Sequence, residues 1–258
     1  ETPEAKAEEV IVRIPVLGAY SKTWPLNCPK SEKIVRGEAE YLARTRANGM
    51  GLGLLFLLST GEEKDLEVAR GWVKETVARY DKIQQLQSST WNAGYEGIGF
   101  CEYYLRTGDA SILPAIEKNA DYLKRNMYNG AWNHFGGVNY SYGHLNAASM
   151  TAATFLLLAR ECGAKVDEHA MQESLKHLYR MAGHGNIGYG DNMPAGGFTD
   201  NGKLGTMAFL MAAAATLTPE GENSIYAKAR DLSAVRSFYS TSWMFHGHTG
   251  GGIGEIWR

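Results

Sequence analysis

Residues that could do acid–base chemistry gather in WNHFGGVNYSYGHLN (residues 132–146), just before and within the first turn of an apolar segment. The N-terminus of a helix carries a partial positive charge, which favours bound anions and developing oxyanions. Removal of the proton α to a uronate carboxylate needs a base such as Tyr or His and an Asn that stabilises the enediolate. We therefore predict Tyr142 or His144 as base and Asn146 as oxyanion partner. The alternative is that His144 caps or buttresses its own helix. His134 and Tyr140 are predicted to contact substrate.

A second group of candidates lies in the glycine-rich run GHGNIGYGDNMPAGGFTD (residues 183–200). Its glycines are too irregular for a phosphate-binding fingerprint, and no strand precedes them. Long loops within compact domains are usually functional, so we expect this one to lie over the mouth of a cavity. Asp191 is a candidate acid. His184, Asn186, Tyr189 and Asp200 are predicted substrate contacts.

A third group opens another apolar segment at TWNAGYEG. Burying the carboxylate of Glu96 is costly unless a cation such as Lys203 pairs with it, or unless it titrates near neutrality as an acid or base. Glu96 is therefore the other candidate acid. Aromatic side chains suit the stacking of sugars, although they are also ordinary core residues. Trp91, Asn92, Tyr95 and Lys203 are predicted substrate contacts.

Metal and thiol chemistry have weaker support in the sequence. His246 and His248 lie two residues apart, and further ligands for a metal, such as His184 with Asp191 or Asp200, could come only through the fold. We predict no metal and no cofactor, and we expect His246 and His248 to line a cavity. The cysteines lack metal-ligand or redox spacing, so Cys101 and Cys162 are expected to be buried thiols.

The elements that must position these residues are helical. Four glycine-rich stretches start roughly fifty residues apart, as in repeat proteins. Amphipathic segments alternate with apolar ones, which predicts outer helices alternating with buried inner helices. About five such hairpins predict an all-α fold, an α/α toroid whose inner helices line a cavity; the pattern leaves open whether the ring is complete. The amphipathic segments are residues 31–46, 63–81, 111–127, 167–181 and 222–238; the apolar ones are residues 49–58, 91–105, 144–160, 203–217 and a last one from Trp243.

One segment at the start of the chain has the pattern of a β-strand. VIVRIPV (residues 10–16) alternates and is β-branched. A lone strand is not stable, so we expect it to complete a sheet from a preceding domain. The predicted domains are residues 1–29, a strand and linker, and residues 30–258, the helical toroid.

Composition excludes several classes of function. The chain has 258 residues, 44% of them hydrophobic, and a net charge of −2. No basic run supports nucleic-acid binding, and no apolar run could span a bilayer. The expected partner is a small-molecule or polysaccharide ligand.

Two resemblances extend this interpretation. IEKNADYLKRNMYNGAW (residues 116–132), with Tyr122-Leu123 before the Gly130-Ala131-Trp132 turn, resembles the repeat of terpenoid-cyclase and prenyltransferase toroids. The acidic motifs of those cyclases, and a Cys counterpart to the zinc ligands of protein prenyltransferases, are missing. More widely, YSKTWPLNCPKSEKI, STWNAGYEGIGFCEYYLRTGD, YGHLNAASMTAATFLLLAREC and GHGNIGYGD resemble an uncharacterised bacterial family in which a PDZ-like domain precedes a helical toroid. That resemblance implies that residues 10–16 end a PDZ-like domain and that the protein is extracytoplasmic, either periplasmic or secreted.

The residues at the inner-helix entries lead to a first hypothesis, a carbohydrate-active enzyme that is a lyase or hydrolase of an acidic polysaccharide. A second is a non-catalytic scaffold that binds a glycan or a peptide. A third is a terpenoid-cyclase-like enzyme, which requires an acidic cluster and an apolar cavity.

Overall fold

A computed structural model describes residues 22, 27–47, 49–138, 143–183, 187–191 and 203–239. The regular elements within these ranges are helical, which confirms the all-α fold. The chain divides into two compact units, Glu1–Thr45 and Arg46–Arg258. The predicted strand at residues 10–16 and the segment from Trp243 lie outside the described residues.

The first unit contributes helix α1 (Pro29–Thr45), close to the predicted residues 31–46. Glu32 in its first turn and Arg44 in its last turn both complement the helix dipole.

The second unit contains the predicted alternation of helices. One prediction was wrong: residues 49–58 do not form a single helix. Gly51 has non-helical backbone angles (φ −85°, ψ −106°), so the chain is kinked within residues 49–53, before the helix that follows. The elements are η1 (Gly49–Gly53), α2 (Leu54–Ser59), α3 (Glu63–Tyr80), α4 (Thr90–Thr107), η2 (Ala110–Ile112), α5 (Leu113–Asn126), α6 (Asn146–Glu161), α7 (Glu168–Ala182), α8 (Lys203–Thr216), η3 (Gly221–Asn223) and α9 (Ile225–Tyr239).

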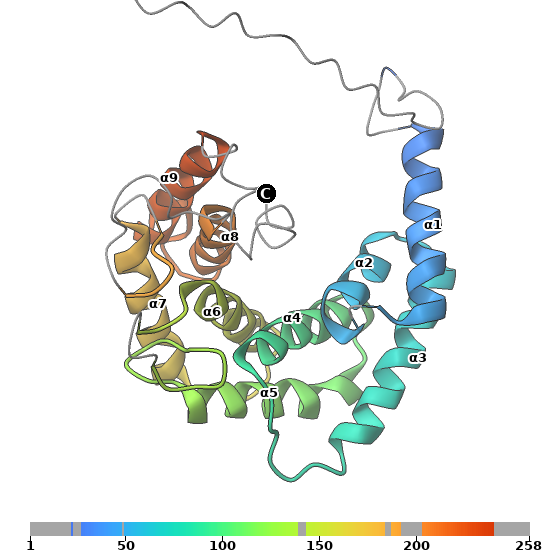
Figure 1. The fold of residues 1–258 in the computed structure, drawn as a ribbon, viewed down its shortest axis with the longest axis horizontal. Helices are drawn as coiled ribbons and strands as arrows, with labels where there is room; N and C mark the ends of the chain where they lie inside the picture. Colours follow the sequence, from blue (N-terminus) through green and yellow to red (C-terminus); the bar gives the residue numbers. More distant parts are fainter. Residues whose placement is uncertain are drawn as a thin grey trace, which may run out of the picture. The chain divides into compact units, whose positions relative to one another are not determined.

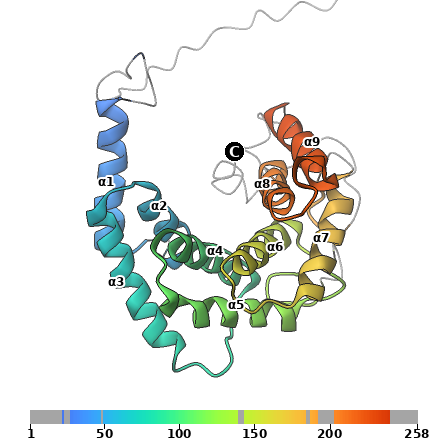
Figure 2. The ribbon, with the colours of Figure 1, turned by 180° about the vertical axis from the view of Figure 1, so that it is seen from behind.

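Within this unit the apolar helices lie side by side. Figures 1 and 2 show α4, α6 and α8 as neighbours, with α5 and α7 covering one side of this row. Every residue of α6 from Asn146 to Leu157 is buried, as expected for an inner helix. Helix α7 buries only one face, as expected for an outer helix. None of the described helices is both long and apolar enough to cross a membrane.

Glycines let the inner elements approach one another closely. A Cβ atom at Gly99 of α4 would overlap the backbone carbonyl oxygen of Met50 in η1. A Cβ at Gly97 would lie 2.6 Å from two ring carbons of Phe155 in α6. Gly97 and Gly99 therefore allow α4 to pack closely against α6 and η1.

The connections between helices are of two kinds. Those that follow the inner helices are short; α4, for example, ends at Gly108 (φ 70°), and Asp167 caps α7 by accepting a hydrogen bond from the Ala170 N–H at 2.8 Å. Those that precede α4, α6 and α8 are longer, and candidate residues lie in these connections and in the first turns of the helices that follow them.

Candidate functional site

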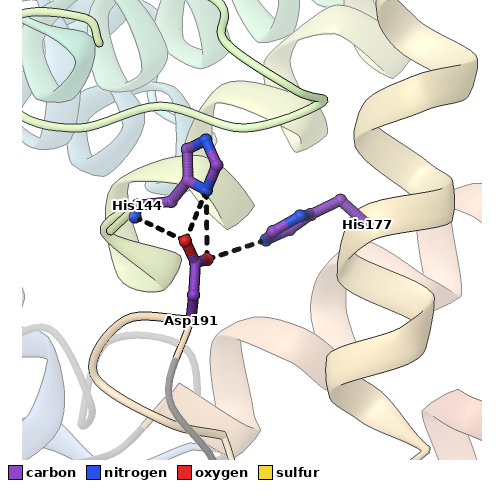
Figure 3. Close-up of side chains that lie close together, drawn as sticks. All are labelled: His144, His177 and Asp191. Atoms are coloured by element: carbon purple, nitrogen blue, oxygen red, sulfur yellow. Dashed lines mark hydrogen bonds and ion pairs between the residues drawn. The ribbon is translucent and has the colours of Figure 1, made fainter. Parts of the chain in front are cut away.

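Two histidines and one aspartate meet at the start of α6 (Figure 3). His144 lies in the loop before α6, His177 on α7, and Asp191 in the loop after α7. The Nδ1 atom of His144 is 3.0 and 2.9 Å from the two carboxylate oxygens of Asp191. The Nε2 atom of His177 is 3.7 Å from Oδ1 of Asp191. The carboxylate therefore lies between the two imidazole rings.

The cluster is enclosed, and Asp191 is its most accessible member. The side chains of His144 and His177 are each 6% exposed, whereas that of Asp191 is 36% exposed. The two rings meet edge to face, with centroids 5.1 Å apart. A ligand from solvent would therefore reach the carboxylate more easily than the imidazoles.

The loop before α6 holds His144 against the aspartate. The backbone N–H of His144 donates to Asp191 Oδ2 at 3.1 Å. Gly143 has φ +75°, and a Cβ atom there would overlap the same oxygen. The N–H of Leu145 donates to the carbonyl of Trp132 at 2.8 Å, and the indole of Trp132 is fully buried with its N–H donating to Leu123. The buried Trp132 thus anchors the segment that carries His144.

Asn146 positions the loop that carries Asp191. Its Nδ2 group donates to the carbonyls of Gly188 and Gly190 at 3.0 and 2.7 Å, and its backbone N–H donates to the carbonyl of Tyr189 at 3.1 Å. Both amide hydrogens are therefore engaged within the protein. Asn146, predicted as an oxyanion partner, has in this arrangement a positioning role.

Both ring nitrogens of His144 face hydrogen-bond acceptors. The Nε2 atom lies 2.5 Å from the backbone carbonyl of Tyr128, and Nδ1 faces the Asp191 carboxylate. A neutral imidazole carries only one N–H, so it cannot satisfy both acceptors. A further proton between Nδ1 and the carboxylate, or a cation there, would supply the missing donor. This arrangement leaves no nitrogen of His144 free to act as the predicted base.

His177, in contrast, has a buried ring nitrogen without a hydrogen-bond partner. Its Nε2 atom faces Asp191 but donates to and accepts from no group. Burial lowers the pKa of His177 to about 4, with His144 and Arg180 acting in the same direction and Asp191 opposing them. The ring is therefore uncharged near neutral pH, and one of its two nitrogens carries a lone pair.

Sequence reasoning missed His177, although the sequence contains a signal for it. Ala170, Ser174 and His177 share a face of α7, and all three are buried. A histidine at helical spacing on the buried face of an amphipathic helix must satisfy its ring nitrogens inside the protein. That requirement could have pointed to His177.

Glu96 belongs to a different hydrogen-bonded group. The hydroxyl of Tyr80 in α3 donates to Glu96 Oε2 at 3.0 Å and accepts from Asn119 Nδ2 at 3.2 Å. Burial raises the pKa of the Glu96 carboxyl, although the hydrogen bond from Tyr80 and the charge of Arg79 act against it. The described hydrogen-bond partner of the Glu96 carboxyl is thus the Tyr80 hydroxyl, and the role of Glu96 as an acid or base stays a prediction.

This raised pKa gives a test of stability against pH. A folded state that holds a proton more tightly than the unfolded chain loses stability as pH rises from the usual glutamate pKa through the folded-state pKa. Glu96→Gln keeps an oxygen acceptor for Tyr80 and cannot ionise, so its free energy of unfolding should lack this decrease. Urea denaturation from about pH 4 to about pH 8 measures the difference. Equal pH profiles for the wild type and Glu96→Gln would contradict the prediction; Glu161→Gln, at an exposed position, is the control.

The predicted aromatic contacts form a group at the start of α4. The rings of Trp91 and Tyr95 are stacked, with centroids 6.1 Å apart and an interplanar angle of 9°. The indole N–H of Trp91 donates to Nδ1 of His134 at 3.1 Å. Asn92 is exposed beside them.

Of the other predicted substrate contacts, Lys203 begins α8 and is buried, and Tyr189 is half-buried. The remaining predicted site residues lie outside the described ranges; they are Tyr140, Tyr142, His184, Asn186, Asp200, His246 and His248.

The fold and the site define an all-α domain of alternating inner and outer helices with a cluster of two buried histidines and one partly exposed aspartate. The chain belongs to the family described as "Domain of unknown function (DUF6288)", which matches residues 31–258. The expected membership of an uncharacterised family is thereby confirmed. No similar curated protein and no similar solved structure was found.

Proposed function

We propose that this domain is a carbohydrate-active enzyme, a lyase or hydrolase of an acidic polysaccharide, with its reaction centre at the His144–His177–Asp191 cluster. The observation that carries the proposal is that three polar side chains from separate segments meet at the entry of an inner helix. His144 and Asp191 are 47 residues apart in the sequence. The sequence alone made His144 a candidate base and Asp191 a candidate acid.

The chemistry of either reaction needs what this cluster offers. A lyase removes a proton α to a carboxylate, and a hydrolase activates a water molecule. Both steps require a lone pair beside a fixed polar group. The unpartnered Nε2 of His177 provides the lone pair, and Asp191, held by His144, provides the fixed and partly exposed carboxylate.

The aromatic group at the start of α4 supports a carbohydrate as the substrate. The planar faces of stacked aromatic rings pack well against the apolar faces of sugar rings, while polar edges bind hydroxyl groups. Trp91 is only half-buried, and its contact with His134 fixes the orientation of the indole.

We also propose that the helices close into an α/α toroid and that a PDZ-like domain precedes it. Buried α4, α6 and α8, flanked by outer helices, support closure into an α/α toroid. The strand-like residues 10–16 and the resemblance described above support a PDZ-like domain before it.

A second candidate function is a non-catalytic scaffold that binds a glycan or a peptide. It is favoured by the internal hydrogen bonds of the cluster, because His144 and Asn146 direct their polar groups to backbone carbonyls of the protein itself. Such contacts are typical of structural networks.

Incubation of the chain with polygalacturonate, alginate and hyaluronan, and with a neutral polysaccharide for comparison, tests the proposal. A lyase yields unsaturated uronates that absorb ultraviolet light, whereas a hydrolase yields new reducing ends without that absorbance. Asp191→Asn and His177→Gln are each expected to lower kcat by about 100-fold or more. His169→Gln, at an exposed position of α7, is the matched control and should retain activity.

Each outcome decides between the candidates. Turnover that survives both substitutions would overturn the assignment of the site. Retention on immobilised polysaccharide without any turnover would favour the scaffold. The absence of both turnover and retention would overturn the carbohydrate proposal.

A further inference from the structure

We propose that the cluster binds a divalent transition-metal ion through Nδ1 of His144, Nε2 of His177 and the carboxylate of Asp191. As a statement about catalysis this inference rests on the proposed function, because it names what the same cluster would hold. As a statement about binding it stands on the geometry of the three side chains.

The distances suit a metal. In tetrahedral zinc sites with bonds of about 2.0–2.1 Å, neighbouring ligand atoms lie about 3.3 Å apart. The separation of His144 Nδ1 from Asp191 Oδ2 is 2.9 Å, and that of His177 Nε2 from Asp191 Oδ1 is 3.7 Å. One ligand atom from each of the three residues lies within 4.8 Å of the others. Small rotations of the side chains would bring all three to one ion.

The surroundings of His144 match those of a metal ligand. Metal-binding histidines usually donate their second ring N–H to a carbonyl or a carboxylate, which fixes the tautomer. The Nε2 atom of His144 lies 2.5 Å from the Tyr128 carbonyl, so a proton on Nε2 leaves the lone pair of Nδ1 directed at the cluster. A cation beside Nδ1 also removes the conflict between the two acceptors that flank the ring.

The second, independent observation is the unpartnered nitrogen of His177. Buried polar atoms in native proteins nearly always have a partner, and one without a partner costs free energy. Nε2 of His177 has none, and its side chain is 6% exposed and directed at Asp191. A metal ion supplies the missing partner.

The ligand set also selects the kind of metal. Imidazole suits zinc and its transition-metal neighbours, whereas magnesium and calcium prefer oxygen ligands. Three protein ligands leave a coordination position open, as in catalytic zinc sites. In the proposed enzyme with an ion bound, the lone pair of His177 would hold the ion rather than accept a proton, and the open position would accept water or the carboxylate of an acidic sugar.

Titration of the metal-free chain with zinc chloride, followed by calorimetry, tests the inference. We expect one zinc ion per chain at this site. His177→Gln and Asp191→Asn should each weaken binding by about 100-fold or more, since each removes a direct ligand. His169→Gln should bind like the wild type, and so should His246→Gln/His248→Gln, which removes the other candidate histidine pair.

A measurement on the wild type covers the case in which a variant fails to fold. Zinc should shift the ring-nitrogen NMR signals of His144 and His177 but not that of His169. Zinc binding without these shifts, or no zinc binding at all, would overturn the inference. Zinc binding at the cluster without turnover of any polysaccharide would instead overturn the proposed function alone.

Discussion

The Gly143→Ala variant is expected to bind zinc at least about 10- to 100-fold more weakly than the wild type, a loss comparable to that caused by disturbing the surroundings of metal ligands. The reason is steric. A Cβ atom at this position would overlap Oδ2 of Asp191 and lie 2.7 Å from its Cγ atom. The carboxylate must therefore move away from His144. In the wild type it accepts a hydrogen bond of 3.1 Å from the backbone N–H of that residue.

A second glycine separates this effect from backbone strain. Gly143 and Gly137 lie in the same connection and have similar backbone angles, φ +75° and φ +67°, but a Cβ at Gly137 would meet nothing within 4 Å. Both alanine variants should lose about 1–2 kcal/mol of stability through the left-handed backbone. Only Gly143→Ala should lose zinc affinity, as measured by calorimetric titration. Equal zinc affinities in the two variants would refute the steric argument.

The Gly99→Ala variant is expected to be destabilised by about 3 kcal/mol or more, the upper range for overpacking. Its Cβ would overlap the carbonyl oxygen of Met50, and this clash is with backbone, which cannot rotate away as a side chain can. Either η1 or α4 must shift, and both are packed against further helices. Urea denaturation monitored by circular dichroism measures the loss.

Gly71→Ala is the matched control, because Gly71 is also inside a helix but a Cβ atom there would meet nothing within 4 Å. At this position alanine should stabilise the protein by about 0.5–1 kcal/mol, since glycine loses more conformational freedom on folding. The two substitutions are chemically identical, but their effects on the free energy of unfolding should have opposite signs. A loss of stability in both variants, of similar size, would show that a general effect of the substitution dominates rather than the clash.

The sequence predicted the helices well, because burial and helical period are local properties. The apolar residues of α6 and the one-sided pattern of α7 each indicate which surface faces the protein interior. The kink at Gly51 could not be predicted, since glycine allows both helical and non-helical angles and packing selects between them.

The site was predicted in part. The polar residues before α6 marked where chemistry could occur, and His144 and Asp191 do meet there. Their partners depend on tertiary structure. Glu96 bonds to Tyr80 from another helix, and His177 reaches the cluster from an outer helix whose sequence pattern indicated only a structural role. A sequence pattern indicates burial but not which buried side chains become neighbours.

The positions of the three ligands along the chain have a thermodynamic consequence. An ion that joins the loop before α6, helix α7 and the loop after α7 would act as a cross-link between segments that separate on unfolding. By mass action, an ion that binds only the folded chain adds about 2.7 kcal/mol of stability when its free concentration is about 100 times its Kd. The stability of this part of the domain against unfolding would then depend on the concentration of free metal. Catalytic activity and resistance to proteolysis would therefore increase and decrease together.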